Sequence, residues 1–423
     1  MLNAILPVRS LLLAIFMLMA GGGFMNTLVS VRLERAGSGT MAIGLVGTAY
    51  FAGLVAGSIR APALLRRIGH IRAFAAFVAV LSASMLAYAL HRDAVFWGLL
   101  RFTDGICLAG IYVCLESWLG ERSEGAARGS VLAGYMIALY GGQAIGQFTL
   151  NLGGPGAAMP LLAGAILVSL AAVPVALTRI AAPAPGEESS LPFRELYAIS
   201  PLGIVGALLT GVMLGAFYAM GAVYARRSGL DLSATALFMS VVILGGVALQ
   251  WPLGRLSDRM DRRKVIVIGF AGTLAASLAI ALTSGVLLLM IFGALFGGLS
   301  FSLYPLCVAH TNDHLVPEQR IAASGGLVLL YSLGAAIGPA LGAAAMTLLD
   351  TAGLFLFIAL CAGAALAFGL WRQIRSQPVP AHSQETYVVL PRTTPMSAAL
   401  DPVAAEESSD RGNSGRLEPR QPA

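Results

Sequence analysis

The stretch that decides the fold reads GRLSDRMDRR at residues 254–263, a charged turn between two long apolar runs. Its arginines and the following Lys264 resist crossing a bilayer, because a charge at the centre of a membrane helix costs roughly 2.5–3.5 kcal/mol on insertion scales. The turn therefore stays on the side of the membrane where it was made. We interpret it as a short cytoplasmic loop between two membrane helices.

The composition indicates an all-α integral membrane protein. Hydrophobic residues make up 57% of the chain and charged residues only 11%, whereas soluble domains carry about 25% charged residues. A hydrocarbon core of about 30 Å needs about 20 apolar residues per helix. The sequence offers twelve such runs, at residues 10–31, 40–59, 71–90, 95–119, 129–151, 157–178, 201–224, 232–253, 265–284, 285–309, 322–349 and 353–372.

The basic residues of the loops indicate the orientation of these spans. With the amino terminus in the cytoplasm, seventeen basic residues lie inside and only five outside, which agrees with the positive-inside rule. We therefore expect a multi-pass protein of a bacterial inner membrane with both termini cytoplasmic. The net charge of +6 is sorted by loop and forms no single patch, so we expect no nucleic-acid partner.

The second half of the chain repeats the first at an offset of 192 residues. Arg67 matches Arg259, Tyr112 matches Tyr304, and residues 142–146 match residues 334–338. Parallel six-helix repeats of this kind occur in secondary transporters. We predict an amino-terminal six-helix bundle (1–178), a cytoplasmic linker (179–200), a second bundle (201–375) and a tail (376–423). The tail is rich in Pro, Ser, Thr and Glu, a composition that predicts disorder.

The charged turn closely resembles the Gly-x-Leu-Ala-Asp-Arg-x-Gly-Arg-Arg signature of the major facilitator superfamily (MFS), with Asp261 where that family usually has Gly. Residues 250–256, 302–305 and 329–334 resemble the YcaD-type bacterial branch. The resemblance implies the MFS fold, a solute site between the two bundles near the midplane, and transport by alternating access. It also implies that Asp258 caps a helix of the other half near residues 125–129.

The fourth span holds the candidates for proton coupling, Arg101, Asp104 and Glu116. Arg101 and Asp104 lie three residues apart, so they can neutralise each other on one helix face, and charged pairs inside a membrane usually mark function. The alternative is an anchor at the outer leaflet. Glu116 lies nearer the cytoplasm, where pairing with Arg122 or Arg128 is an equal possibility.

The tenth span ends in a polar cluster with two histidines four residues apart, His310 and His314. This spacing occurs in metal sites, but the third ligand is missing, so we expect no metal and no cofactor. A titratable cap at a cytoplasmic gate is the preferred interpretation. The other residues expected at this gate are Gly254, Asp258, Arg259, Arg262, Arg263, Arg66, Arg67, Asp313, Glu318 and Arg320.

Polar residues inside the spans predict a solute cavity, although each of them singly suits helix packing as well. Together they favour a neutral or weakly charged organic solute. The candidates for lining this cavity are Asn26, Tyr50, Tyr112, Gln143, Gln147, Tyr218, Gln250, Tyr304 and Tyr331.

The sequence thus predicts a secondary transporter of a small organic solute, monomeric, embedded in the lipid bilayer and driven by protons. Drug or metabolite efflux by proton antiport is an alternative. The antiporter signature of the superfamily, Gly-x-x-x-Gly-Pro, appears at residues 142–146 with Gln147 in place of the Pro. A membrane enzyme is excluded because no clustered nucleophile or metal set is present. A non-transporting sensor is a second alternative, which a folded partner-binding tail would favour.

Overall fold

The computed structural model describes residues 5–122, 127–154, 156–178, 191–375, 377–380 and 384–401. All regular elements in these residues are helices. They are η1 Leu6–Val8, α2 Arg9–Gly22, α3 Met25–Arg35, α4 Thr40–Ile68, α5 His70–Ala87, α6 Ala94–Arg122, α7 Ala127–Gly146, η2 Gln147–Asn151, α8 Met159–Leu170, α9 Ala172–Ala176, α10 Phe193–Ile199, α11 Pro201–Arg227, α12 Leu232–Ser257, α13 Arg262–Leu282, α14 Val286–Asn312, α15 Pro317–Leu348, α16 Gly353–Arg375 and η4 Pro395–Leu400.

Eleven of the described helical segments are long and apolar enough to cross a membrane. The expected span at residues 129–151 corresponds to α7 and η2 and is not among them, because its glycines, tyrosines and glutamines lower its mean hydropathy. The division that rested on length alone, at Ser284, is confirmed by a helix break between Leu282 and Val286. The expected linker contains α10; its residues 179–190 lie outside the described part.

Asp261, the departure from the superfamily signature, has a local structural role. Its side chain accepts a hydrogen bond of 3.1 Å from the backbone N–H of Arg263 and so caps the start of α13. Aspartate is among the preferred residues at this position, because its carboxylate satisfies an N–H group that has no partner inside the helix. The charged turn therefore ends α12 at Ser257 and starts α13 at Arg262.

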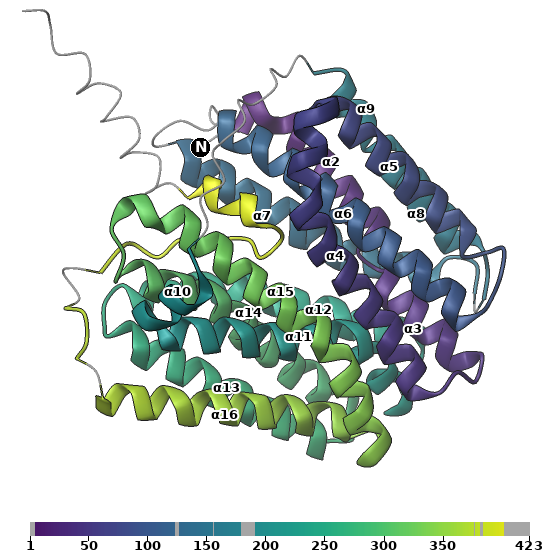
Figure 1. Ribbon diagram of the computed structural model, residues 1–423. Helices are drawn as coiled ribbons and strands as arrows, with labels where there is room; N and C mark the ends of the chain where they lie inside the picture. Colours follow the sequence, from purple (N-terminus) through teal and green to yellow (C-terminus); the bar gives the residue numbers. More distant parts are fainter. Residues whose placement is uncertain are drawn as a thin grey trace, which may run out of the picture.

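The helices form two groups that lie side by side (Figure 1). In the first group α2 packs on α7 and α8, and α4 and α5 pack on α6. In the second group α11 packs on α15 and α16, while α14 packs on α12 and α13. The pairs α4·α6 and α12·α14 occupy matching places in the two groups, as do α2·α7 and α11·α15.

The packing confirms the repeat down to individual atoms. A Cβ on Gly53 would lie 2.1 Å from the carbonyl oxygen of Phe102, and one on Gly245 would lie 2.2 Å from that of Ala294. The two glycines, and the two residues whose carbonyl oxygens they approach, are each 192 residues apart. The same holds where α2 crosses α7, with Phe16 O beside Gly142, and where α11 crosses α15, with Leu208 O beside Gly334. Glycine is needed at these four positions because the backbones touch.

The two groups meet at one end of the molecule, which we call the far end. Gly44 of α4 lies against Ala343 and Pro339 of α15, and α3 packs on α11. Arg227 at the end of α11 forms a 2.8 Å ion pair with Glu34 of α3. The far end is thus closed by contacts between the halves.

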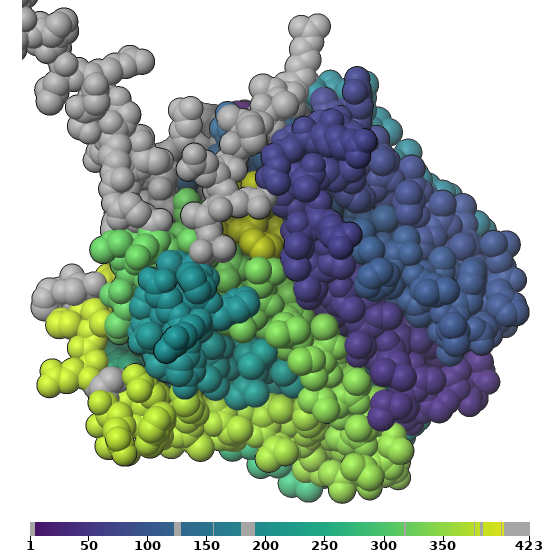
Figure 2. Space-filling view, viewed as in Figure 1, coloured from purple at the N-terminus to yellow at the C-terminus, as the bar shows by residue number. Residues whose placement is uncertain are grey.

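At the opposite end, the turn end, which carries residues 254–263, part of the tail lies between the halves. The helix η4 contacts α6 of the first half and α15 of the second, and Figure 2 shows its yellow atoms between the blue and green groups. The prediction of disorder is therefore wrong for residues 384–401, whose Leu390, Thr394, Ala398 and Leu400 are buried. Residues 402–423 lie outside the described part.

Candidate functional site

A buried ion pair lies on α6, as the sequence predicts. Arg101 Nη2 is 2.5 Å from Asp104 Oδ2, and both side chains are almost fully buried. Tyr88 lies beside the pair; its hydroxyl donates to Asp104 Oδ2 at 2.7 Å and accepts from Arg101 Nε at 2.7 Å. The burial does not fit an anchor that extends into the outer leaflet, because a side chain of that kind keeps its charged head in water.

Two expected cavity residues instead serve this pair. Arg101 Nη1 donates to Asn26 Oδ1 at 3.0 Å, and the guanidinium lies 5.1 Å from the centre of the Tyr50 ring. Asp104 Oδ1 is buried and has no hydrogen-bond partner among the described residues. The cluster therefore keeps one carboxylate oxygen without a donor, next to a fully engaged cation. Sequence reasoning missed Tyr88, a polar ring at the end of the adjacent span.

Glu116 lies on the same helix, nearer the turn end, and is fully buried. The Tyr135 hydroxyl donates to its Oε1 at 2.8 Å. The hydroxyls of Thr393 and Thr394, in the tail, donate to Oε1 and Oε2. Sequence reasoning placed Glu116 near the cytoplasmic loops, with Arg122 or Arg128 as a partner. Arg128 donates to the carbonyl oxygens of Gly120 and Asp401, and the Arg122 side chain lies outside the described part.

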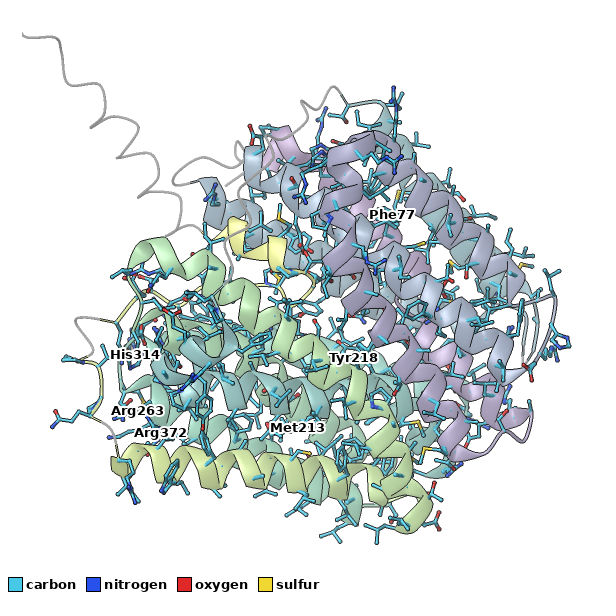
Figure 3. All side chains as sticks on the ribbon, in the orientation of Figure 1. Phe77, Met213, Tyr218, Arg263, His314 and Arg372 are labelled. Atoms are coloured by element: carbon cyan, nitrogen blue, oxygen red, sulfur yellow. The ribbon has the colours of Figure 1, made fainter. Side chains whose placement is uncertain are left out.

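Four rings surround the guanidinium of Arg392, and we call Tyr140, Tyr218, Phe301 and Tyr331 the aromatic cage. The guanidinium carbon lies 4.2 Å from the centre of the Phe301 ring and 5.7 Å from those of Tyr140 and Tyr331. Arg392 Nη2 also donates to the Tyr218 hydroxyl at 3.4 Å. Figure 3 shows Tyr218 where the two helix groups adjoin.

The cage combines residues from both halves, since Tyr140 is on α7 and the other three are on α11, α14 and α15. Tyr218 and Tyr331 were expected cavity residues, and Tyr304 packs behind Tyr331 with ring centres 5.2 Å apart. Sequence reasoning missed Tyr140 and Phe301. Tyr140 lies three residues before the predicted Gln143, but at the offset of 192 residues it matches Ser332, so the repeat gives no signal for it.

The remaining cavity candidates lie in contacts between helices. Gln147 accepts from Thr27 at 2.9 Å and donates to Gly23 O at 3.0 Å. Other candidates in such contacts are Gln250, which donates to Phe301 O at 3.4 Å, Tyr112, which donates to Met19 Sδ at 3.2 Å, and Gln143, which packs on Gly23. For these four the structure supports the packing interpretation.

At the turn end the buried Arg262 connects several of the residues that the sequence predicts at a gate. Arg262 Nη1 is 2.6 Å from Asp313 Oδ1 and donates to Ala309 O at 3.0 Å, while Nη2 is 3.1 Å from Asp258 Oδ1. Burial raises the pKa of Asp313 against the opposing effect of Arg262. Asp258 thus pairs within its own half; residues 123–126, which would precede α7, lie outside the described part.

The tail binds directly to this network. The backbone N–H of Glu385 donates to Asp313 Oδ1 at 3.0 Å, and that of Tyr387 donates to Asp258 Oδ1 at 2.8 Å. Arg262 Nη2 donates to Glu385 O at 2.5 Å. The Tyr387 ring occupies the space where a Cβ on Gly254 would lie. Gly254, in the charged signature, is therefore a contact for the tail.

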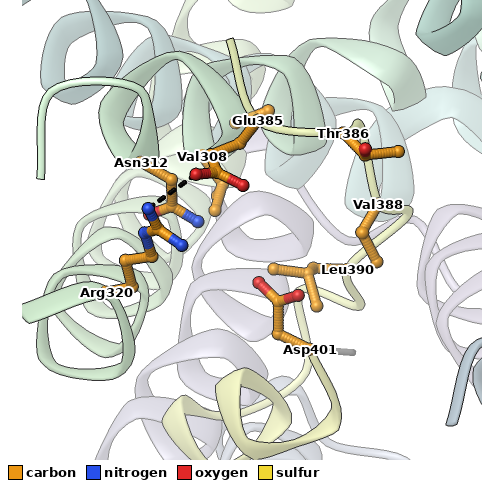
Figure 4. Close-up of a pocket in the computed structure, with 9 residues that line it drawn as sticks. Val308, Asn312, Arg320, Glu385, Thr386, Val388, Leu390 and Asp401 are labelled. Atoms are coloured by element: carbon orange, nitrogen blue, oxygen red, sulfur yellow. Dashed lines mark hydrogen bonds and ion pairs between the residues drawn. The ribbon is translucent and has the colours of Figure 1, made fainter. Parts of the chain in front are cut away.

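A second arginine secures the same part of the tail. Arg320 forms a 2.7 Å ion pair with Glu385, and the two residues border a cavity of about 20 Å³ (Figure 4). Asp401 lines the other side of this cavity. A space of this size holds about one water molecule. While the tail is in place, no organic solute fits beside it here.

The other expected gate residues are spread around the turn end. Arg263 pairs with Asp261 at 2.9 Å; burial acts to raise the pKa of Asp261, but hydrogen bonds and charge from Arg263 hold that pKa below its usual range. The rings of His310 and His314 meet edge to face, with their centres 4.9 Å apart. Among the described residues, no group of three possible ligands is placed to hold a metal ion. Arg259, Arg66 and Arg67 are exposed, and the side chain of Glu318 lies outside the described part.

A many-spanned helical membrane protein, built of two repeated halves around a central site, has the architecture of a secondary transporter. The family model of the Major Facilitator Superfamily matches residues 228–403. The chain is 29% identical over 357 residues to an "Uncharacterized MFS-type transporter YcaD" of Salmonella enteritidis PT4, covering 84% of this chain and 92% of the relative. The YcaD protein of Salmonella dublin is also 29% identical, over 359 residues.

Solved structures support the same fold. The nucleoside transporter NupG has a TM-score of 0.70 at 14% identity, covering 88% of this chain and all of that one. A bacterial homolog of the human lysosomal transporter Spinster, in an inward-facing and occupied conformation, has a TM-score of 0.68 at 15% identity, with coverages of 97% and 98%. The chain is therefore similar, over most of its length, to membrane transporters of the major facilitator superfamily.

Proposed function

We propose that the protein is a proton-coupled secondary transporter that moves a small organic solute across a bacterial inner membrane by alternating access. The observation that carries the proposal is the unequal contact between the halves. They touch at the far end, through α4 and α15 and the Glu34–Arg227 pair, and are separated by the tail at the turn end. Alternating access needs this kind of one-sided opening.

In this proposal the bundles of residues 1–178 and 201–375 rock against each other, with 179–200 as their cytoplasmic connection and both termini in the cytoplasm. The far end then faces outward. The positive-inside distribution of the loops supports this sidedness. Uptake and efflux use the same movement, and the direction follows from the gradients.

Proton coupling is assigned to the buried groups of α6. Asp104 lies beside Arg101 and Tyr88 and keeps one oxygen without a donor among the described residues, so a proton could bind there without displacing a hydrogen bond. Ionisable groups inside a membrane commonly serve as proton relays. Glu116, buried on the same helix, is the second carboxylate of this set.

Counterflow and pH-driven uptake in proteoliposomes test this assignment, with a panel of labelled cationic, neutral and anionic organic solutes. We expect Asp104→Asn to abolish accumulation driven by a pH gradient while counterflow continues, because an amide cannot release a proton. Thr103→Val is the matched control, since Thr103 is half-buried and its hydroxyl donates to Leu99 O within its own helix. Equal loss of both activities in Asp104→Asn would contradict a coupling role.

A further inference from the structure

The strongest unexplained feature is a segment that fills the centre of the transporter. Residues 384–401 run from the gate network at the turn end to η4, between α6 and α15. They contact side chains of both halves, including Glu116 of the first and Tyr218 of the second. The segment combines a short apolar run, residues 387–390, with polar residues, and its polar groups pack only where the surrounding groups match them chemically.

The contacts of Arg392 show what the centre recognises. Its guanidinium lies over three rings of the aromatic cage and donates to the hydroxyl of the fourth. Within the described residues, no carboxylate forms an ion pair with Arg392. The faces of aromatic rings attract cations through their quadrupoles, and the attraction is stronger when the site is dry. The cage thus holds a cation by ring faces.

The residues next to Arg392 in the tail form hydrogen bonds to Glu116, the buried carboxylate of α6. Thr393 and Thr394 donate to both oxygens of Glu116, and Tyr135 donates to one of them. All three donors are neutral, so the tail satisfies this carboxylate without neutralising its charge. When the tail leaves, Tyr135 is the one remaining donor of the three, and the carboxylate then needs a cation or a proton, since a buried unpaired charge is costly.

We propose that the aromatic cage and Glu116 form the solute site, that this site selects small organic cations with a guanidinium or ammonium group, and that residues 384–401 occupy it as an internal competitor. Arg392 stands where the cationic group of the solute binds. The inference rests on the proposed transport function and narrows its substrate class. It narrows to a cation the neutral or weakly charged organic solute that the polar residues of the spans predicted.

The gate network explains how the competitor is held and released. Asp258, Arg262 and Asp313 bind the backbone of Glu385 and Tyr387, and Arg320 pairs with the Glu385 side chain. Arg128 of the first half donates to Asp401 O. Both halves therefore grip the segment, and its departure is required before the halves can close at this end. A tethered competitor acts at an effective concentration in the millimolar range.

Equilibrium binding of labelled tetraethylammonium and methylguanidinium to the purified protein tests the proposal, with uridine as a neutral probe. We expect Arg392→Gln, and a chain truncated after Gln377, to bind the cations at least tenfold more tightly than the wild type. Arg375→Gln is the matched control, because Arg375 is exposed at the end of α16 and stacks on Trp371. Adding Glu116→Gln to the truncated chain should weaken cation binding at least tenfold.

Transport of the same three probes in proteoliposomes separates this inference from the proposed function. Uridine transport that rises on truncation, without any cation binding, would overturn the cation class and leave the transporter proposal intact. Cation binding that is equal in the wild type, Arg392→Gln and the truncated chain would overturn the internal competitor. Tail-sensitive cation binding without transport of any probe would support the site and contradict the transport function.

Discussion

The two halves share their backbone crossings but not their charges. Gly53 and Gly245 contact carbonyl oxygens 192 residues apart, as do Gly142 and Gly334. Yet α6 carries Arg101, Asp104 and Glu116, whereas the matching positions of α14 are Gly293, Phe296 and Val308. At these matched positions only the first half carries buried ionisable groups. The second half provides three of the four rings of the aromatic cage.

At the turn end the asymmetry is reversed. The second half has the network of Asp258, Arg262 and Asp313, while the first half has Arg66, His70 and Glu121 at the same offset. Close helix crossings are needed in both halves, because every pair of spans must pack. Buried charges are costly in a membrane, so they are retained where they have a function. The comparison indicates that the two halves kept the same helix packing after duplication and that each half carries different functional residues.

The largest effect is expected at the close helix crossings that the two halves share. Gly53→Val and Gly245→Val should each abolish the folded protein, because the new Cβ would lie 2.1 or 2.2 Å from a backbone carbonyl oxygen. Overpacking costs about 1–3 kcal/mol where side chains can yield, and here the neighbour is backbone. Size-exclusion chromatography of the detergent-solubilised protein measures the loss. Gly363→Val is the control, with nothing within 4 Å of its Cβ; a folded peak for either crossing variant would refute the shared frame.

The next effect concerns the ion pair that only the first half has. Arg101→Met should destabilise the protein by about 3–5 kcal/mol, because it leaves Asp104 charged and buried without its counter-ion. The double variant Arg101→Met, Asp104→Leu should recover most of this loss, since Gly293 and Phe296 show that the fold needs no charge at this place. The midpoint of thermal unfolding in detergent measures both. A double variant as unstable as the single one would show that the pair itself holds the fold.

A smaller effect is expected at the gate that only the second half has. Asp258→Asn should weaken both the hydrogen bond from Tyr387 N–H and the pairing with Arg262. Hydrogen bonds to charged groups contribute about 1.5–3 kcal/mol, but the Asp258 side chain is 32% exposed, so water screens its charge. We therefore expect the tail to be bound more weakly by about 1 kcal/mol.

The tail should then leave about fivefold more often, which maleimide labelling of a cysteine placed at Leu390 measures. The four native cysteines are buried and give a low background. The exchange Arg66→Gln in the first half should leave the labelling rate unchanged. If Asp258→Asn is labelled at the same rate as the protein that carries only the cysteine at Leu390, Asp258 does not hold the tail.

The smallest effect is expected at the far end, where the Glu34–Arg227 ion pair adds to the helix contacts between the two halves. Glu34→Gln should change the equilibrium between open and closed far ends by less than about fivefold, because a partly exposed ion pair contributes about 0.2–1 kcal/mol. Labelling of a cysteine at Ala343, which lies on α15 against Gly44 of α4, reports the opening. The difference should fade in 1 M salt, where the Debye length is about 3 Å. A salt-independent effect would indicate a packing role for Glu34.

Much of the frame could be predicted because it depends on local or periodic signals. The apolar runs gave the spans, the fixed offset gave the repeat, and the spacing of three residues placed Arg101 beside Asp104. The site was predicted less completely. Tyr88 and Tyr140 come from other helices than the groups they serve, and no spacing along the chain relates them to those groups.

The tail shows most clearly why composition misled. Disorder was expected because residues 376–423 have no apolar face of their own to bury. In the structure, the hydroxyls of Thr393 and Thr394 meet Glu116, and the guanidinium of Arg392 meets the aromatic cage. The partners lie between 60 and about 280 residues away in sequence. The tail orders where its short apolar run at residues 387–390 packs on the core and such distant groups satisfy its polar side chains.

The sequence alone determined the class of fold, the number of repeats and the charged pair of α6, because hydrophobic length, positional repetition and helical periodicity act along the chain. Only the tertiary structure decided which polar residues face the centre and which join helices, as with Tyr218 and Gln147. It alone placed the tail between the halves. These outcomes depend on which surfaces two separately folded bundles bring together, and that is a property of the assembled chain.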